Sequence, residues 1–435
     1  MLANLIYILA LFAASPVVLY RAVRFGRYRR GISEKLFGLS KQRADELCGK
    51  HGCVWLHAVS VGEVNLLSGI VEGLQASAPE TAIAISTSTD TGYDLAIKKF
   101  GSHRVFFCPL DFTWAVRRTL ENLRPNKLIL AELELWPNLI RLSAERGCPT
   151  FVFNARLSEK SAKGYAKFAA LTRSTFARLN WVGCQDATTA KRFIDCGTLA
   201  DRVHVTGSLK FDGAPDSRDT LEIQERVQWA GRDPWHRVWL FGSTQAGEEQ
   251  LAIDVYQRLR SSHHELRLIL VPRHPERFDA VSLLIESAGL SVHRRSTGHS
   301  LEHSAWENDT VILVDSIGEL KHWWGVSHIA TVGGSFGDRG GQNMLEPAGY
   351  GCATSFGPNT RNFAQIADNL LRVGGAVRVA DVNELETFVA KCLDDIPAAD
   401  ALGRNARSVV AANRGATETT IAALVGTAGR QRAAA

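Results

Sequence analysis

Short apolar runs alternate with longer segments of helical spacing along most of the chain. In the first half the runs lie at 54–60, 81–89, 104–111, 126–132, 149–156, 181–185 and 202–212. In the second half they lie at 237–244, 266–274, 310–316, 328–335, 352–359 and 376–381. Most are followed by about 10–15 residues with apolar positions three or four apart, the spacing of an amphipathic helix. This alternation predicts parallel sheets covered by helices.

The same pattern occurs twice, so we expect two doubly wound α/β domains. The predicted divisions are a basic-flanked anchor at 1–30, a first domain at 31–212, a linker at 213–236, a second domain at 237–410, and a C-terminal helix and tail at 411–435. One core seldom exceeds about 250–300 residues, which also favours two domains. In such sheets ligands bind beyond the carboxyl ends of the strands, so we expect the site there, in a cleft between the domains.

Composition narrows the possible functions. Hydrophobic residues make up 45% of the chain and charged residues 22%, which is typical of a globular protein. The net charge of +5 favours anionic partners, but no zinc-finger spacing, aromatic RNA-binding motif or dense basic stripe indicates nucleic acid. The eight cysteines occur singly, which predicts buried, reduced thiols and neither a disulfide framework nor a zinc site.

The first twenty residues carry no charge, and the next ten carry five arginines. A secretory signal peptide has its basic residues before the apolar segment, whereas basic residues after it favour a cytoplasmic location for the rest of the chain. The apolar segment approaches the length that crosses a bilayer, and Pro16 leaves room for a shallower interfacial anchor. The alternative is a buried N-terminal helix, but the arginines favour contact with anionic lipid headgroups.

Glu63 follows the first apolar run and a glycine, directly before a segment of helical spacing. A carboxylate in a first helical turn gains about 0.3–1 kcal/mol from the helix dipole, so a structural role alone would explain it. Glu132 and Glu134 follow another run. In an extended backbone these two alternate in direction, so only one of them needs to face a site. Pro137 is well placed to begin the next helix.

Further polar side chains follow later runs. Ser243 and Thr244 end a strand-like run and could cap a helix there, whose N-terminus would favour an anion. Arg273, His274 and Arg277 follow the next run, and such residues suit a phosphate better than a core. In the glycine-rich stretch 332–351 we expect a helix to begin near Asn343, with Glu346 one turn inside, where a carboxylate can accept ribose hydroxyls.

Seven motifs occur in one order: HAVSVGE, ELELWPN, NARLS, GSLKFD, GSTQAGEE, VPRHPER and GGQNMLEPAGYG followed by FGPN. Together with the basic-flanked N-terminus they resemble the Kdo transferases, which add 3-deoxy-D-manno-octulosonic acid (Kdo) to the lipid A precursor of Gram-negative bacteria. The resemblance extends from the N-terminus to about residue 370. It implies the GT-B fold, with two Rossmann-like domains, a deep cleft, and a C-terminal helix that returns to the first domain.

The resemblance also implies the reaction: inverting transfer of Kdo from CMP-Kdo to the 6′-hydroxyl of lipid IVA, without a metal or other cofactor. Glu63 matches the glutamate regarded as the general base. The residues implied to orient the acceptor or the base are Glu134, Asn154 and Arg156. The residues implied to bind the donor are Lys210, Ser243, Thr244, Arg273, His274, Gly334, Ser335, Asn343 and Glu346. The expected location is the cytoplasmic face of the inner membrane, beside anionic lipids; the oligomeric state is not predicted.

A few positions depart from the family's usual motifs. Gln245 and Gln342 stand where histidine is common, Met344 where proline is common, and Leu133 where threonine is usual, which leaves no imidazole at the two glutamine positions. Two alternatives remain: another GT-B enzyme such as a nucleotide-sugar epimerase, and a two-lobed binding protein. The arginine-flanked anchor argues against the first alternative, and the lack of a signal peptide pattern argues against the second.

Overall fold

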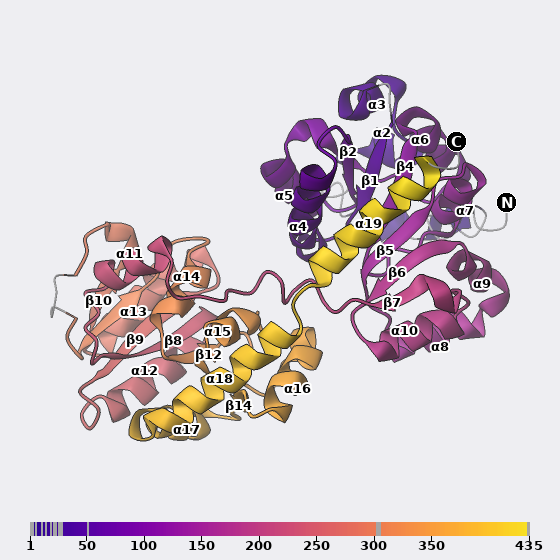
Figure 1. Ribbon diagram of the computed structural model, residues 1–435. Helices are drawn as coiled ribbons and strands as arrows, with labels where there is room; N and C mark the ends of the chain where they lie inside the picture. The colour runs from indigo at the N-terminus through magenta and orange to yellow at the C-terminus, as the bar shows by residue number, and fades with distance from the viewer. Residues whose placement is uncertain are drawn as a thin grey trace. The chain divides into compact units, whose positions relative to one another are not determined.

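The computed structural model describes residues 29–49, 52–301 and 306–432, together with isolated positions between residues 4 and 24. The chain forms two compact units (Figure 1). Unit 1 comprises residues 1–212 and 414–435, and unit 2 comprises residues 213–413. Each unit contains a seven-stranded sheet in which all strand pairings are parallel. The predicted class of two α/β units is therefore confirmed.

The sheet of unit 1 has the order β3-β2-β1-β4-β5-β6-β7. Its strands are β1 (Cys53–His57), β2 (Ile83–Thr87), β3 (Val105–Phe107), β4 (Pro125–Ala131), β5 (Thr150–Ala155), β6 (Leu179–Cys184) and β7 (Val203–Val205). Its helices are α2 (Ile32–Phe37), α3 (Lys41–Cys48), α4 (Val61–Ser77), α5 (Asp90–Phe100), α6 (Thr113–Leu123), α7 (Pro137–Glu145), α8 (Glu159–Lys167), α9 (Ala169–Ala177), α10 (Ala187–Asp195) and α19 (Ala416–Arg432), with 3-10 turns η1 (Ser102–Arg104) and η2 (Ala200–Arg202). The order reverses between β1 and β4, the switch point at which such sheets bind ligands.

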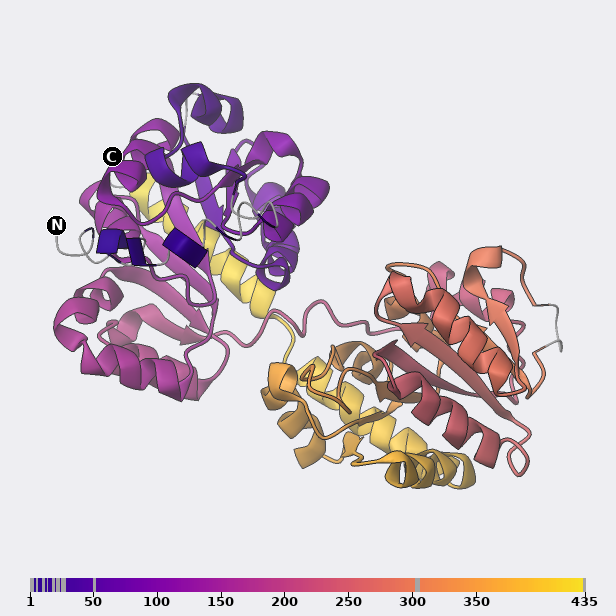
Figure 2. The ribbon, with the colours of Figure 1, turned by 180° about the vertical axis from the view of Figure 1, so that it is seen from behind.

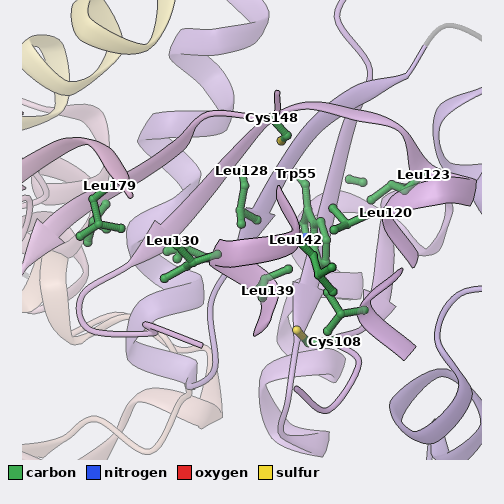
Figure 3. Packing of buried hydrophobic residues seen from close by; sticks show 14 of the residues in the cluster. Trp55, Cys108, Leu120, Leu123, Leu128, Leu130, Leu139, Leu142, Cys148 and Leu179 are labelled. Atoms are coloured by element: carbon green, nitrogen blue, oxygen red, sulfur yellow. The ribbon is translucent and has the colours of Figure 1, made fainter. Parts of the chain in front are cut away.

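Successive residues of the unit 1 strands supply two separate cores, because side chains alternate across a strand. Trp55 and Leu128 pack on one face with residues of α6 and α7, as Figure 3 shows. Leu56 and Ile129, their neighbours in sequence, pack on the other face with residues of α4 and α19. Both faces are fully buried, which explains why these strands read as continuous apolar runs.

The sheet of unit 2 has the order β10-β11-β9-β8-β12-β13-β14, with its switch point between β8 and β12. Its strands are β8 (Arg237–Thr244), β9 (Leu266–Pro272), β10 (Ser291–Arg294), β11 (Thr310–Leu313), β12 (Ile329–Val332), β13 (Ala353–Phe356) and β14 (Ala376–Arg378). Its helices are α11 (Leu221–Trp229), α12 (Glu248–Leu259), α13 (Phe278–Ser287), α14 (Leu320–Val326), α15 (Leu345–Gly349), α16 (Ala364–Arg372), α17 (Val382–Asp394) and α18 (Ile396–Ala412), with 3-10 turns η3 (Pro275–Arg277), η4 (Arg295–Thr297) and η5 (Arg361–Phe363).

The C-terminal helix α19 belongs to unit 1. Figures 1 and 2 show it on one face of that unit's sheet, where it packs against α4. Asp212 holds its start: the carboxylate accepts the backbone N–H groups of Gly415 at 2.7 Å and Thr417 at 2.6 Å. Leu424 is fully buried in the core that α19 shares with α4.

Three predicted boundaries need correction. The segment 213–236, predicted as a linker, belongs to unit 2 and contains α11, which packs against α14. The segment after the run 149–156, where the pattern predicts one helix of about 10–15 residues, forms two helices, α8 and α9, which meet at Phe168. The C-terminal division at 411 falls inside α18, which continues to Ala412.

The predicted anchor at 1–30 lies mostly outside the described residues. None of the helices in the described part of the chain has the length and apolarity needed to cross a membrane. Described positions in this segment contact other parts of unit 1. Asn4 Oδ1 accepts the backbone N–H of Thr113 at 3.1 Å, the Tyr7 hydroxyl donates to Asp111 at 2.9 Å, and Arg30 pairs with Asp94 at 2.8 Å.

Candidate functional site

Glu63 lies in the first turn of α4, just beyond the carboxyl end of β1, and it forms a capping box with Ser60. Ser60 Oγ accepts the Glu63 N–H at 3.3 Å and donates to Glu63 Oε1 at 2.7 Å. Glu63 Oε2 accepts the N–H of Val59 at 2.9 Å. The side chain is only partly buried. The helix-capping role considered in the sequence is therefore real, and it fixes the carboxylate at the end of the strand.

Glu132 and Glu134 lie near Glu63, because β4 is the neighbour of β1 at the switch point. Burial raises the pKa of Glu134 to about 7, and the charges of Glu63 and Glu132 add to this rise. Burial also raises the pKa of Glu132, to which Glu63 contributes as well. Glu63 thus acts electrostatically on both members of the pair, and not on one alone. The strand ends at Ala131 and Glu132 has φ 52°, so the backbone turns and brings both carboxylates toward Glu63.

Asn154 connects this acidic cluster, Glu63, Glu132 and Glu134, to the following loops. Its side chain is fully buried near the end of β5, and its backbone has φ 51°. Its Nδ2 donates to Glu132 Oε1 at 3.4 Å, and its Oδ1 accepts the N–H of Leu209 at 3.1 Å. Left-handed backbone at two non-glycine residues is costly, and such strain concentrates at functional sites. Asn154 therefore orients Glu132 from within the protein.

Two basic side chains balance the acidic cluster. Lys210 and Arg156 both lower the pKa of Glu132 by their charge, against the larger effect of burial. Arg156 is exposed and Lys210 is partly buried. Lys210, predicted to bind the donor, thus lies in unit 1 and acts on Glu132.

The helix starts predicted in unit 2 are displaced. Strand β8 continues through Ser243 and Thr244, and α12 begins at Glu248 after Gly247. Helix α15 begins at Leu345 and has only 5 residues. Ser243 and Thr244 therefore cap no helix, and Ser243, with φ 57°, is a third strained residue at a strand end.

The glycine-rich loop after β12 is held by Glu248, a residue that the sequence interpretation missed. Its buried carboxylate accepts four backbone N–H groups. They belong to Gln245 at 2.9 Å, Gly334 at 2.7 Å, Ser335 at 3.1 Å and Phe336 at 3.1 Å. Backbone N–H groups that converge in this way form a nest for an anion. In this protein the side chain of Glu248 supplies that anion.

Glycine is required beside this nest. A Cβ atom on Gly333 would lie 2.7 Å from Ser243 O and 2.8 Å from Glu248 Oε2. These distances are too short for any larger residue. The GG pair of the sequence therefore permits the close approach of β8, β12 and the Glu248 carboxylate.

Several predicted donor ligands are engaged inside the protein. The buried Thr244 hydroxyl donates to Glu249 Oε1 at 2.7 Å, and Arg277 contacts both oxygens of Glu249 at 2.6 and 3.0 Å. The buried Ser335 hydroxyl donates to Val332 O at 2.6 Å and accepts the N–H of Gly357 at 2.7 Å. Thr244, Arg277, Gly334 and Ser335 therefore shape the loops, and their polar groups are already bonded.

The remaining predicted donor residues are more accessible. Arg273 is exposed beside the end of β8, where its N–H donates to Thr244 O at 3.0 Å, and His274 is partly exposed. Asn343 Nδ2 donates to Glu346 Oε1 at 3.0 Å. Burial raises the pKa of Glu346, and the charges of Lys321 and Arg273 act in the opposite direction. A cation, an amide and a carboxylate therefore meet at the carboxyl end of the unit 2 sheet.

The eight cysteines are all free and buried, as predicted. Within the described ranges, no group of three or more His, Cys, Asp or Glu side chains is arranged to hold a metal ion.

Known proteins match this chain over most of its length. The profile of the 3-deoxy-D-manno-octulosonic-acid transferase (kdotransferase) family matches residues 23–213. The enzyme named 3-deoxy-D-manno-octulosonic acid transferase of Haemophilus influenzae is 33% identical over 91% of this chain and 91% of its own length. The enzyme of that name from Bordetella pertussis is 31% identical over 96% of this chain and 98% of its own length.

A solved structure gives an independent comparison of the fold. The UDP-GlcNAc 2-epimerase of Neisseria meningitidis, bound to UDP-GlcNAc, aligns with a TM-score of 0.55 at 11% identity, over 86% of this chain and 99% of that one. At this identity the likeness shows the fold alone. The identity to the two transferases extends over nearly the whole chain, and the chain therefore belongs to the 3-deoxy-D-manno-octulosonic acid transferase family of lipopolysaccharide biosynthesis and is a glycosyltransferase.

Proposed function

We propose that this enzyme transfers Kdo from CMP-Kdo to the 6′-hydroxyl of lipid IVA, with inversion at the anomeric carbon and without a metal. The observation that carries the proposal is the acidic cluster at the switch point of unit 1, where Glu63 is fixed by its capping box beside Glu132 and Glu134. A sugar hydroxyl attacks readily only when a nearby base accepts its proton.

In the proposed reaction the Glu63 carboxylate takes the proton of the acceptor hydroxyl as its oxygen bonds to the anomeric carbon of Kdo. The bond from that carbon to the CMP phosphate oxygen breaks, and its electron pair leaves with CMP. Glu134 and Asn154 orient the acceptor and the acidic cluster. On the donor side we assign Arg273 to the phosphate, because a guanidinium stabilises the charge that develops on the leaving group. Asn343 and Glu346 are assigned to the ribose.

One assay tests the reaction. Protein in detergent is incubated with CMP-Kdo and lipid IVA, with and without EDTA. We expect release of CMP and a gain in lipid mass equal to one or more Kdo units, unchanged by EDTA. Loss of activity in EDTA that added Mg²⁺ restores would contradict the metal-independent reaction. Binding of CMP without transfer would contradict the assignment of donor and acceptor.

Glu63→Gln separates capping from catalysis. The glutamine amide can keep hydrogen bonds to Val59 and Ser60, but it cannot accept the proton. We expect kcat to fall by about 10²–10⁴-fold, the usual contribution of a general base, while CMP binding and Tm stay nearly unchanged. Glu72→Gln, the same change on an exposed position of α4, is the matched control. If Glu63→Gln kept near-normal kcat, the base would have to be another residue.

We further propose that the protein acts at the cytoplasmic face of the inner membrane, held by its N-terminal segment and by anionic lipids. The five arginines that follow the apolar segment support this proposal. Flotation with vesicles that contain phosphatidylglycerol tests it. We expect deletion of residues 1–30 to abolish co-flotation, and equal flotation of the full and shortened chains would overturn the proposal.

A further inference from the structure

A second concave site lies within unit 2, at the opposite end of its strands from the candidate donor residues. This pocket has a volume of about 650 Å³ and is lined by Arg218, Asp219, Ile223, Gln224, Val227, Gln228, Arg232, Gly325, His328, Gly351 and Asp400. Apart from Asp400 in α18, its lining residues precede β8, β12 or β13, whereas Arg273 and Asn343 follow strands. Strand β12 alone separates the two ends by about 13 Å, at about 3.3 Å per residue.

Helix α11, in the segment predicted as a linker, forms one wall of this pocket. Ile223, Gln224, Val227 and Gln228 line it, and their spacing places them on one face of the helix. Gln224 and Gln228 are exposed, so the wall offers amide groups as well as apolar surface. The volume lies within the range of about 300–1,000 Å³ that is usual for small-molecule sites.

Two basic groups in the pocket have N–H donors with no acceptor among the described residues. Arg232 donates through NH1 to Val326 O at 3.0 Å, but its Nε is buried without a hydrogen-bond partner. His328 Nδ1 accepts the N–H of Val238 at 3.1 Å, so a neutral imidazole carries its proton on Nε2. No described residue accepts from that Nε2. Unpaired donors of this kind call for an explanation, and a bound anion is one.

Three arginine charges lie close to one another at this end of unit 2. Burial lowers the pKa of Arg232, and the charges of Arg218 and Arg237 lower it further. Burial lowers the pKa of His328 to about 3, and Arg232, Arg218 and Arg237 contribute to this shift. A cluster of like charges favours an anionic ligand.

Arg218 builds the wall of the pocket. Its guanidinium donates to the carbonyl oxygens of Tyr350 at 3.0 Å, Gly325 at 2.9 Å and Ser327 at 2.7 Å. These bonds hold the loops before β12 and β13 together. Because carbonyl oxygens carry no net charge, they do not neutralise the positive charge of Arg218. Asp219 and Asp400, both exposed, also line the pocket, so a ligand with several negative charges would be repelled.

We propose that this pocket binds the phosphate of a phosphomonoester whose remaining part is small and polar, at a site separate from the donor site. The phosphate would lie against the Arg232 guanidinium and accept from His328 Nε2, and Gln224 and Gln228 would contact the polar part. A phosphomonoester carries one or two charges, which suits a cationic pocket with two aspartates at its edge. The proposal does not depend on the identity of the sugar donor or acceptor.

Thermal unfolding of the full chain in detergent tests the site, with inorganic phosphate and glycerol 3-phosphate as probes and with chloride at equal ionic strength as reference. We expect either probe to raise Tm by about 2–4 °C, the shift that about 1 kcal/mol of binding stabilisation gives in a domain of this size. Arg273→Met, which weakens the proposed donor site, should leave this shift intact. A phosphate shift that disappears in Arg273→Met would place the anion in the donor site and overturn the proposal.

Variants locate the site. Gln228→Glu adds a negative charge on an exposed position of the wall, so folding should persist while the phosphate shift disappears. Arg232→Met should abolish the shift whatever its effect on Tm itself. Glu225→Gln, a charge change on the same helix outside the lining, should keep the shift. Equal phosphate shifts in wild type and in both pocket variants would overturn the proposal, as would a wild-type shift no larger than that in chloride. Tighter binding through Arg232 of vesicles with phosphatidic acid than of glycerol 3-phosphate would mean that the phosphate belongs to a lipid, and it would overturn the proposal of a small polar ligand.

Discussion

A carboxylate can stabilise the start of a helix and act as a general base at the same time, and Glu63 has the geometry for both roles. Its capping box with Ser60 uses one lone pair on each carboxylate oxygen. An ionised carboxylate has about four such positions, so acceptors remain for a substrate hydroxyl. The capping bonds also fix the rotamer, which a general base requires. The cap therefore favours the catalytic assignment and does not compete with it.

Glu134 should make the acceptor reaction depend on pH near neutrality. Its pKa of about 7 means that it loses its proton as the pH rises from 6 to 8. The negative charge that Glu134 then carries makes proton transfer from the acceptor hydroxyl to the acidic cluster more favourable. We expect kcat/KM for the acceptor to rise through pH 7, and Glu134→Gln to flatten this rise. Activity profiles between pH 5.5 and 8.5 measure it, with the exposed Glu80→Gln as control.

The same group affects stability in a known direction. Because folding raises the pKa of Glu134, its contribution to stability is complete below its unfolded value of 4.5 and is lost as the pH rises through about 7. Glu134→Gln should therefore raise Tm relative to wild type at pH 8. The gain should be on the order of 1–2 °C, since solvent screens a partly buried group. A profile for Glu134→Gln that parallels the wild type would contradict both expectations.

Glu248 should act on donor binding through the loop that it holds. In Glu248→Gln an N–H₂ group replaces one carboxylate oxygen. This group is a donor and cannot accept the two backbone N–H groups that the oxygen accepts, so those hydrogen bonds are lost. With about 1.5–3 kcal/mol for a hydrogen bond to a charged group, we expect KM for the donor to rise by roughly 10–100-fold. KM for the acceptor should stay unchanged. Steady-state kinetics with each substrate varied in turn measures this split.

Chemical rescue separates this positioning role from general destabilisation. Glu248→Ala vacates the nest of N–H groups, so formate should restore part of the donor affinity while chloride at equal ionic strength should not. Glu286→Gln, an exposed position on α13, is the matched control. Equal loss for both substrates, with no response to formate, would mean that Glu248 serves the fold alone.

At the scale of elements, the apolar runs predicted the strands of both sheets, including the short edge strands β3, β7 and β14, but they missed β10. β4 and β9 contain the buried apolar runs 128–131 and 268–272, because both faces of each sheet are covered. β10, an edge strand of four residues with two basic side chains, has no such run. The segment of α11 resembles a linker in sequence because this helix contributes few buried residues, among them Ile223, to the core.

The candidate site could be predicted only in part, because sequence indicates strand order but not the contacts between loops that are distant in sequence. The rule that ligands bind beyond strand ends located Glu63, Glu134 and Arg273, because it depends only on topology. It could not show that Glu248 fills the nest formed by the loop 334–336. That contact joins residues 86 to 88 positions apart and depends on the packing of β8 against β12.

The start of α19 depends on a residue distant in sequence. Asp212 accepts two N–H groups at the beginning of this helix, the bonds that an N-cap residue normally supplies. Asp212→Ala should lower the free energy of unfolding of unit 1 by about 1–2 kcal/mol, and Asp212→Asn by less, because one acceptor oxygen remains. Amide hydrogen exchange in α19 measures the change. Asp201→Ala, an exposed aspartate of the same unit, should leave exchange in α19 unaltered.

At the scale of the whole molecule, the chain leaves unit 1 at residue 212 and returns to it at residue 414. Stability therefore follows spatial packing and not distance along the sequence. Leu424 is fully buried against the core that contains α4, although more than 340 residues separate the two in sequence. In contrast, α18 ends at Ala412, only twelve residues before Leu424, and it belongs to unit 2.

Leu424→Ala tests whether the two units unfold independently. Removing a fully buried leucine side chain costs about 2–5 kcal/mol, and the loss falls on the core in which the cavity forms. We expect amide hydrogen exchange to accelerate in α4 and β5, with no change in α17 and α18, whereas Glu418→Ala, an exposed position of the same helix, should alter neither. Faster exchange in α18 together with α4 would mean that the two units unfold as one. Because Glu63 lies in the first turn of α4, the variant should also lower acceptor turnover at temperatures where unit 1 begins to open, while binding of CMP persists.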